Sequence, residues 1–402
     1  MKRENYFDHA ATSPLDPRVL EAMLPWLGED FGNASSLHPW GDKARFVVEQ
    51  ARERVAMACG VAPEQVFFCS GGTEACNLAV RLLASRGSFG VSPFEHSAVR
   101  ESAARHGGMV LENRGWDVLV PPGVGVAMMG VCNETGGIPA LKTVGAPIPS
   151  GSGRMSLALT SGEMATLHPG LRNDGVGDPD PEGIGAPTAT ESQALRFLDA
   201  TQSFAKTHDD DWETADLIAL SAHKFGGPQG VGAFILRDPA QFKLPEDAAN
   251  DGGYQETFFS GTTPVPLVVG MGIAAEIARD EEDENFAHAA ELRDVLLEAI
   301  SKIPDARDNN APEQSPFILS ITIPGLVAHA LVIELGTRGF GTSSGAACSS
   351  RSTAPSPVLT ALGLSEADAL ATIRVSFASS NTKESTLALA NALKESAERL
   401  RS

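Results

Sequence analysis

Residues 195–236 read LRFLDATQSFAKTHDDDWETADLIALSAHKFGGPQGVGAFIL. Three short apolar runs in this stretch, residues 195–200, 217–222 and 231–236, are typical of strands buried on both faces. Polar side chains follow directly where the first two runs end. In a parallel sheet the carboxyl ends of the strands meet at one edge, and ligands bind there. The stretch therefore predicts a sheet with a ligand site at its edge.

The chain before this stretch alternates helix-like and strand-like patterns. Residues 42–59 carry apolar side chains at a helical period, and Gly60 follows as a stop. Residues 73–85 predict a second helix. Short apolar or β-rich runs predict further strands at 65–69, 88–94 and 126–132. Strands that alternate with helices are joined by right-handed crossovers into a mostly parallel sheet, so the predicted fold class is α/β.

The last third of the chain predicts a smaller α+β unit. A helical pattern covers residues 268–303, and we expect an interruption at the acidic run DEEDE, residues 280–284. Further strands are expected at 317–323 and 372–378, and further helices at 327–335 and 383–400. The Gly/Pro content of residues 261–266 marks a boundary. We therefore expect a large domain of residues 15–262 and a small domain of residues 1–14 and 263–402.

Composition narrows the class of protein. The 402 residues include 51 acidic and 31 basic side chains, a formal net charge of −20. Such a surface repels phosphate backbones and anionic headgroups, so we expect neither a nucleic-acid nor a membrane partner. There is no apolar run of membrane-helix length, and the first residues lack the pattern of a secretion signal.

Five cysteines without CxxC spacing indicate no metal site and no disulfide framework, and they favour a reducing cytoplasm. Four of them lie in apolar surroundings and are expected to be buried. Cys348 differs because it lies in the small polar tract TSSGAACSSRST. The Gly/Pro-rich residues 145–187 argue against regular structure and predict a long excursion between two sheet elements.

The segment CSGGTEACN, residues 69–77, follows a predicted strand and opens a predicted helix. Two glycines let the backbone approach a ligand closely, and a helix N-terminus offers unpaired N–H groups. With Gly72 and the hydroxyl of Thr73, this turn could hold a phosphate. An ordinary strand–helix turn capped by Thr73 explains the same residues.

Three further side chains follow predicted strands. Asp199 and Gln202, in LDATQS, could face a protonated ring nitrogen, or Asp199 could simply cap a helix. Lys224, in SAHKFGG, could form a Schiff base if burial lowers its pKa, or it could be an ordinary surface lysine.

His96, in FEHSAV, could stack on a planar cofactor or could only begin a helix. VCNETGG offers Asn133 and Glu134, and IRVSF offers Arg374; asparagine and arginine together suit a carboxylate, although Arg374 could equally form a surface ion pair. Taken together, a phosphate cradle, a stacking ring, a ring-nitrogen partner, a reactive lysine and a carboxylate-binding arginine indicate a pyridoxal-phosphate (PLP) enzyme acting on an amino acid.

On these residues the sequence resembles the cysteine desulfurases of the class V aminotransferase family. The resemblance extends over most of the chain, in the family's order: FDHAATSPLDPRV, FGNASSLHPWG, SGGTEACNLA, EHSAV, CNETGG, DATQS, SAHKFGGPQGVGA, SGTTPV, SSGAACSS and IRVSF. It implies the PLP fold type I, with a seven-stranded, mostly parallel sheet in the large domain and a smaller α+β domain.

The resemblance also implies roles for individual residues. Lys224 looks like the lysine that attaches the cofactor, Asp199 the partner of the pyridine nitrogen, and Gln202 the partner of the ring hydroxyl. His96 would stack on the ring. The phosphate would be held by Gly72, Thr73, Ser221 and His223, and by Thr262 of the neighbouring subunit of a homodimer. Ala222 and Asn133 would also contact the cofactor.

Asn133, Arg374 and Asn33 would hold the substrate carboxylate, and Cys348 resembles the nucleophilic cysteine. By resemblance, the expected reaction takes sulfur from L-cysteine, releases alanine and leaves a persulfide on Cys348. The sulfur would pass to an acceptor protein, such as an iron–sulfur cluster scaffold. A related lyase or aminotransferase, for example one acting on selenocysteine, and a scaffold without activity remain alternatives.

Overall fold

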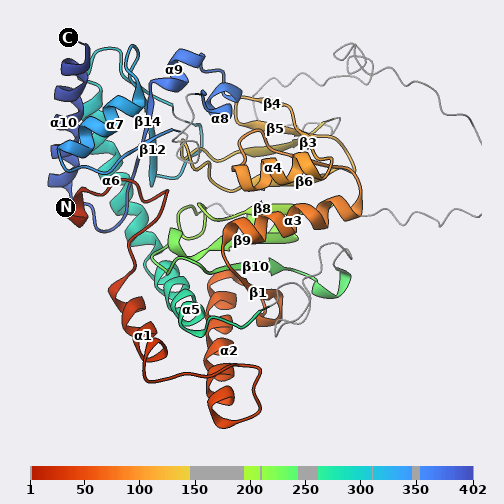
Figure 1. The fold of residues 1–402 in the computed structure, drawn as a ribbon. Coiled ribbons are helices and arrows are strands. Elements are labelled where there is room, and N and C mark those ends of the chain that lie inside the picture. The colour runs from red at the N-terminus through yellow and green to blue at the C-terminus, as the bar shows by residue number, and fades with distance from the viewer. Residues whose placement is uncertain are drawn as a thin grey trace, which may run out of the picture.

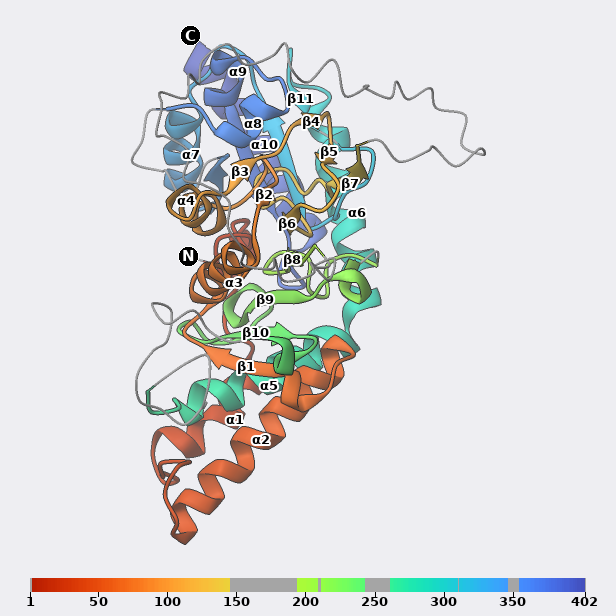
Figure 2. The same ribbon diagram turned by 90° about the vertical axis from the view of Figure 1, so that its right-hand side faces the viewer.

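The structure, a computed structural model, describes residues 2–144, 194–208, 211–242, 261–309, 311–345 and 354–401. Figures 1 and 2 show a central sheet with helices on both faces, and a second group of strands and helices near the two termini. The predicted excursion at 145–187 and the residue Cys348 lie outside the described residues.

The central sheet has seven strands in the order β1-β10-β9-β8-β6-β2-β3. All are parallel except β10, which pairs antiparallel with both β1 and β9. The bounds are β1 Val66–Cys69, β2 Phe89–Val91, β3 Met109–Val110, β6 Gly125–Met129, β8 Arg196–Asp199, β9 Leu217–Ser221 and β10 Gly232–Leu236. This mostly parallel sheet confirms the predicted α/β fold class.

The two faces of the sheet are covered by different helices. Alternation along β9 sends Ile218 and Leu220 into a core with α2 (Pro39–Cys59) and α5 (Val265–Asp280). Leu217 and Ala219 point the other way, into a core with α3 (Gly72–Arg86) and α4 (Ser97–Arg105). The helix α1 (Pro17–Leu27) packs against α5. A strand buried on both faces is why these sheet segments are apolar throughout.

A four-stranded antiparallel sheet, β11-β12-β14-β13, forms the second group. Its own core includes Phe7 of the N-terminal segment, whose N–H and C=O pair with Gly341 and Ser376. The bounds are β11 Arg307–Asp308, β12 Ile318–Thr322, β13 Ser343–Ser344, β14 Thr372–Ser376, α6 Glu282–Ile300, α7 Ala328–Thr337, α8 Pro357–Ala361, α9 Glu366–Leu370 and α10 Lys383–Arg401. The N-terminus is therefore anchored to the C-terminal third of the chain.

The expected interruption of the long helix is confirmed, because α5 ends at Asp280 and α6 begins at Glu282. The helix α5 packs along α2 so closely that a Cβ added at Gly272 would lie 2.8 Å from the Cα of Ala51. Since α5 shares its core with α2, the chain crosses from one core to the other near this helix break. The division into domains of residues 15–262 and residues 1–14 with 263–402 stays a prediction.

A small third sheet, β4-β5-β7, was not expected from the sequence. It consists of β4 Asn113–Arg114, β5 Asp117–Val120 and β7 Ala140–Thr143. These strands are two to four residues long and half-exposed, so their apolar pattern is weak. Among the described residues, no helix is long and apolar enough to cross a membrane.

Candidate active site

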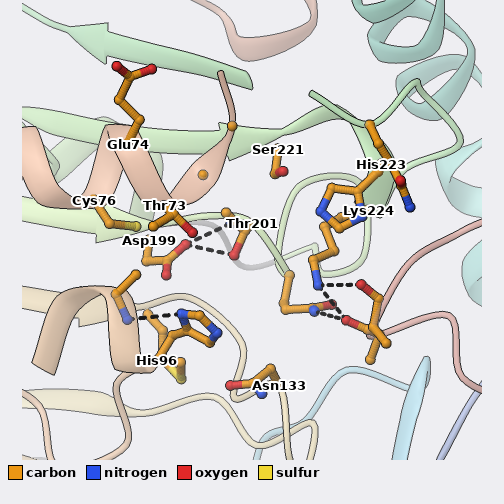
Figure 3. A pocket seen from close by; sticks show the side chains of 18 of the residues that line it. Thr73, Glu74, Cys76, His96, Asn133, Asp199, Thr201, Ser221, His223 and Lys224 are labelled. Atoms are coloured by element: carbon orange, nitrogen blue, oxygen red, sulfur yellow. Dashed lines mark hydrogen bonds between the residues drawn. The ribbon is translucent and has the colours of Figure 1, made fainter. Parts of the chain in front are cut away.

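A cavity of about 470 Å³ lies at the carboxyl edge of the central sheet (Figure 3). The strands β1, β8 and β9 all end at this edge, with Cys69, Asp199 and Ser221 at their last positions, and β10 lies between β1 and β9. The cavity is lined by most of the predicted site residues: Gly72, Thr73, His96, Asn133, Asp199, Gln202, Ser221, His223, Lys224 and Arg374. Side chains far apart in the sequence are thus brought to one place.

The turn between β1 and α3 supplies backbone to the cavity. Gly71 caps α3 with a φ of 150°, a conformation that favours glycine. A Cβ added at Gly72 would lie 2.7 Å from Cγ2 of Thr201 and 3.3 Å from Cβ of Ser221. The helix cap is Gly71 and not Thr73, which leaves the Thr73 side chain available to the cavity. The two glycines at the start of the helix leave its first N–H groups uncovered, which suits an anionic group.

Asp199 ends β8 and is buried, with 3% of its surface exposed. Its Oδ1 accepts hydrogen bonds from the backbone N–H of Thr201 at 3.1 Å and from the Thr201 hydroxyl at 2.8 Å. The turn therefore fixes the carboxylate at the cavity wall. The thiol of Cys76 lies next to it, and burial, followed by the charge of Asp199, raises the pKa of this thiol well above its usual value.

Lys224 ends the 3₁₀ turn η5 (Ala222–Lys224) directly after β9. Its Nζ donates hydrogen bonds to the carbonyl oxygens of Ala10 at 2.6 Å and Ala11 at 3.0 Å. Lys224 is therefore held inside the site, and its interpretation as an ordinary surface lysine is wrong. Gln202 donates from Nε2 to the same Ala10 carbonyl at 2.6 Å, and its buried Oε1 has no hydrogen-bond partner among the described residues.

Two histidines reach the cavity from different elements. His96 caps α4, because its Nδ1 accepts from the N–H of Ala98 at 3.1 Å, and it also lines the cavity. His96 therefore begins the helix and also lines the cavity, and its stacking on a cofactor stays a prediction. His223 contacts the hydroxyl of Thr12 through Nδ1 at 3.0 Å. Burial lowers the pKa of His223 to about 4, assisted by the charge of Lys224, so this ring is neutral at neutral pH.

Arg374 lies in the middle of β14 and is only 1% exposed, so it forms no surface ion pair. Its guanidinium group donates to the carboxylate of Asp8 and to the carbonyl oxygen of Asn133, each at 2.7 Å. The buried Nε has no hydrogen-bond partner among the described residues. Near it, Glu134 accepts from the Ser356 hydroxyl at 2.6 Å, and burial raises the pKa of Glu134 to about 7.

Some predicted residues do not line the cavity of this single chain. Asn33 and Thr262 are exposed, and Asn33 uses its Oδ1 to accept from the N–H and hydroxyl of Ser35. Ala222 is fully buried below the cavity wall. Cys348 lies outside the described residues. No group of metal-ligating side chains occurs in the described ranges.

The structure also shows cavity residues to which sequence reasoning gave no role. Ala10 and Ala11 contribute carbonyl oxygens, which no side-chain motif reveals. Thr201 and Cys76 surround Asp199, and only their place inside quoted motifs, DATQS and CSGGTEACN, points to them. The interpretation of Cys76 as a buried apolar filler was therefore incomplete, because this cysteine also lines the cavity.

These features define a class of protein: an α/β protein with a lysine, an aspartate and an arginine around a glycine-lined helix N-terminus at the sheet edge. The comparisons agree, since the class V aminotransferase family matches residues 5–113 and 179–389. The chain belongs to the class V aminotransferase family, whose members use PLP.

Similar proteins cover almost the whole chain. A protein of Neisseria meningitidis named "Cysteine desulfurase IscS" is 32% identical over 409 aligned residues, covering 100% of this chain and 94% of that protein. One of Vibrio vulnificus with the same name is 33% identical, covering 96% and 90%. Among solved structures, a "NifS-like protein" has a TM-score of 0.76 at 27% identity and covers 98% of both chains. The structure "SspA in complex with cysteine" has a TM-score of 0.69 at 26% identity and covers 94% of this chain and 100% of that chain.

The residues present fit PLP. The unpartnered Oε1 of Gln202 is a buried acceptor that a ring hydroxyl could satisfy. The N-terminus of α3, with Gly71, Gly72 and Thr73, lines the cavity, so its N–H groups could hold a phosphate. Asp199 is a buried acid that a protonated ring nitrogen could neutralise. These are observations on the chain itself and do not depend on the relatives.

Proposed function

We propose that the chain is a PLP-dependent cysteine desulfurase that removes sulfur from L-cysteine. One observation supports this most: Lys224, Asp199 and Arg374 line a single cavity in a member of this family. Similar proteins carry the name cysteine desulfurase, and one similar structure contains cysteine. Delivery of the sulfur to an acceptor protein, such as one that assembles iron–sulfur clusters, is part of the proposal.

The proposed roles divide between cofactor and substrate. Gly72, Thr73, Ser221 and His223 would hold the phosphate of PLP. Asp199 would neutralise the pyridine nitrogen, Gln202 would bind the ring hydroxyl and His96 would cover one face of the ring. Bound in this way, PLP supplies an electron sink for the electron pair that forms at the substrate Cα.

The remaining residues act on the substrate. Asn133 and Arg374 would orient its carboxylate, with the unpartnered Nε of Arg374 as one donor. The amine of Lys224 would move the proton at the substrate Cα. The thiolate of Cys348 would then attack the substrate sulfur.

The reaction balances without a further reactant. The Cβ–Sγ bond of L-cysteine breaks, and a sulfur–sulfur bond forms at Sγ of Cys348. The products are alanine and a persulfide on Cys348, so neither an external oxidant nor a reductant is consumed. The persulfide sulfur is then available to an acceptor thiol.

The test uses alanine release from L-cysteine by the PLP-loaded protein. Cys348→Ala should lower the rate at least a hundredfold, while the visible spectrum of the bound cofactor stays unchanged. Cys59→Ala is the matched control, because Cys59 is a buried cysteine at the end of α2 and does not line the cavity.

An undiminished rate in Cys348→Ala would overturn the proposal and favour a lyase or aminotransferase that acts on another amino acid, such as selenocysteine. A chain that takes up no PLP would instead indicate a scaffold without activity.

A further inference from the structure

Asp8 forms an ion pair with Arg374 inside the molecule. Its Oδ1 accepts a hydrogen bond from Nη2 of Arg374 at 2.7 Å. The side chain of Arg374 is 1% exposed and that of Asp8 is 21% exposed. Among the described residues, Asp8 is the only acid that forms an ion pair with this guanidinium group. A charge-assisted bond of this kind offsets part of the cost of burying the arginine.

The main chain on both sides of Asp8 is fixed by the strand that carries Arg374. The N–H of Ser376 donates to the carbonyl oxygen of Phe7 at 2.8 Å, and the hydroxyl of Ser376 accepts from the N–H of Ala10 at 2.9 Å. Ser376 and Arg374 project from the same face of β14, because side chains alternate along a strand. Asp8 is therefore held opposite Arg374 by contacts other than the ion pair itself.

The guanidinium group of Arg374 is held at a second point. Its Nη1 donates to the carbonyl oxygen of Asn133 at 2.7 Å, and both residues line the cavity. A planar group that is bound at two nitrogens by two different chain segments cannot rotate freely. The third nitrogen, Nε, is buried and has no hydrogen-bond partner among the described residues. The two contacts therefore fix the direction in which Arg374 offers its remaining N–H groups.

The N-terminal segment that contains Asp8 also contacts the proposed cofactor lysine. The carbonyl oxygen of Asp8 accepts from the N–H of Ala11 at 3.0 Å, which closes a turn. The carbonyl oxygens of Ala10 and Ala11 accept from Nζ of Lys224 at 2.6 Å and 3.0 Å. One turn thus contacts Arg374 through its first side chain and Lys224 through its last carbonyl groups.

We propose that Asp8 is a positioning residue: it orients the guanidinium group of Arg374 so that its remaining N–H groups meet the carboxylate of an amino-acid substrate. The inference rests on the proposed function, because it takes the substrate to be an amino acid, but it holds for L-cysteine and for other amino acids alike. Asp8 does not line the cavity itself, so it acts through Arg374 and not on the substrate.

A role limited to charge compensation makes a different prediction. Asp8→Glu keeps the negative charge but adds a methylene group, which displaces the carboxylate or the guanidinium group. Asp8→Asn removes the charge and keeps an oxygen that can accept from Nη2. If Asp8 only compensates a buried charge, Asp8→Asn should be the more damaging change. If Asp8 orients Arg374, Asp8→Glu should be the more damaging change to carboxylate recognition.

The experiment compares two ligands of the full-length, PLP-loaded protein: L-alanine, the product of the proposed reaction, and ethylamine, the same molecule without its carboxylate. Each is titrated while the visible absorption is followed, and the ratio of the two dissociation constants measures recognition of the carboxylate. We expect Asp8→Ala and Asp8→Glu to lower the preference for L-alanine about tenfold, and Asp8→Asn to retain it to within about threefold. The affinity for ethylamine should stay unchanged in all three variants.

Glu291→Gln is the control, because it removes an exposed acid of α6 that pairs with Lys383 outside the cavity. It should leave both dissociation constants unchanged. The far-ultraviolet circular dichroism of each variant checks folding. If Asp8→Ala does not fold, the contrast between Asp8→Asn and Asp8→Glu still decides between orientation and charge compensation.

A second readout needs neither cofactor nor substrate. Phenylglyoxal modifies guanidinium groups, and the modified fraction of Arg374 in the PLP-free chain is measured by peptide mass spectrometry. Modification should be about threefold faster or more in Asp8→Ala than in the wild type or Asp8→Asn, because a guanidinium group held by a charge-assisted hydrogen bond is less available to the reagent.

An unchanged preference for L-alanine in Asp8→Ala would overturn the inference, and so would a preference that falls further in Asp8→Asn than in Asp8→Glu. An unchanged rate of Arg374 modification in Asp8→Ala would also overturn it. If the preference falls as expected but the wild type releases no alanine from L-cysteine, Asp8 keeps its positioning role and the proposed desulfurase activity is refuted.

Discussion

Single residues of the candidate site serve the local fold and the cavity together. Asp199 accepts two hydrogen bonds that close the turn to Thr201, yet it also lines the cavity. His96 does the same at the start of α4. The capping and functional interpretations of these residues, which the sequence leaves open, are therefore compatible. The turn that holds each side chain also restricts the rotamers available to it, which pre-organises the site.

His9 gives a prediction about acid stability. It is 1% exposed, and burial, with the charge of Lys206, lowers its pKa from 6.5 to about 3. The folded state therefore favours the neutral ring, so its contribution to stability is complete above pH 6.5 and is lost as the pH falls towards 3. When the pH is lowered from 8 to 5, protonation of His9 in the unfolded chain should therefore reduce the free energy of unfolding by about 2 kcal/mol.

The measurement compares urea unfolding of the wild type and His9→Phe at both pH values. Phe preserves the edge-to-face contact with Tyr6, whose ring centroid is 5.0 Å away, and cannot be protonated. The variant should lose less stability on acidification than the wild type, whereas His208→Phe, at a half-exposed histidine, should lose as much as the wild type. If the wild type and both variants lost the same free energy of unfolding between pH 8 and pH 5, the lowered pKa of His9 would be refuted.

At the scale of elements, the sequence predicted six of the seven strands of the central sheet and the helices α2 and α3 to within a few residues, but not β3, α1 or α4. The reason is that buried strands are apolar throughout, and glycines such as Gly60, with a φ of 64°, end helices in a recognisable way. The small sheet β4-β5-β7 lacks such a pattern. The hydrogen bonds from Lys224 to the carbonyl oxygens of Ala10 and Ala11 could not be predicted either. Every residue has a carbonyl oxygen, and only the tertiary structure determines which of them lie at the site.

The N-terminus of α3 gives a prediction at this scale. Gly72→Ala would place a Cβ against Thr201 and Ser221, so the helix N-terminus should move away from the cavity. We expect the affinity for PLP to fall at least tenfold in equilibrium dialysis. Gly336→Ala is the matched control, because a Cβ on α7 meets nothing within 4 Å.

Gly336→Ala should leave PLP affinity unchanged and stabilise the fold by up to about 1 kcal/mol, since alanine is favoured over glycine in helices. Unchanged affinity in Gly72→Ala would show that the close approach of backbone at this turn is not needed for the cofactor.

At the scale of the whole molecule, the exposed apolar side chains concentrate in one part of the chain. Among the described residues, eight of the fifteen exposed large hydrophobic side chains fall between Leu20 and Met57, on α1, α2 and the segment between them. Figures 1 and 2 show these helices projecting from the body of the molecule. Soluble monomers rarely expose such a concentration of apolar side chains. Asn33, one of the proposed site residues outside the cavity, lies in the same segment.

This surface is therefore our candidate for the interface of the proposed homodimer, which would bring Thr262 and Asn33 to the cavity of the partner. Phe31 is 66% exposed and Leu37 is 95% exposed, so changing both to Asp should not disturb the fold of one chain. The double variant should elute as a monomer in size-exclusion chromatography with light scattering and bind PLP more weakly. Ile333→Asp, on a 69% exposed residue of α7, should remain a dimer with normal affinity. A double variant that stays dimeric would place the interface elsewhere, and a monomeric one with undiminished PLP affinity would show that one chain completes the cofactor site alone.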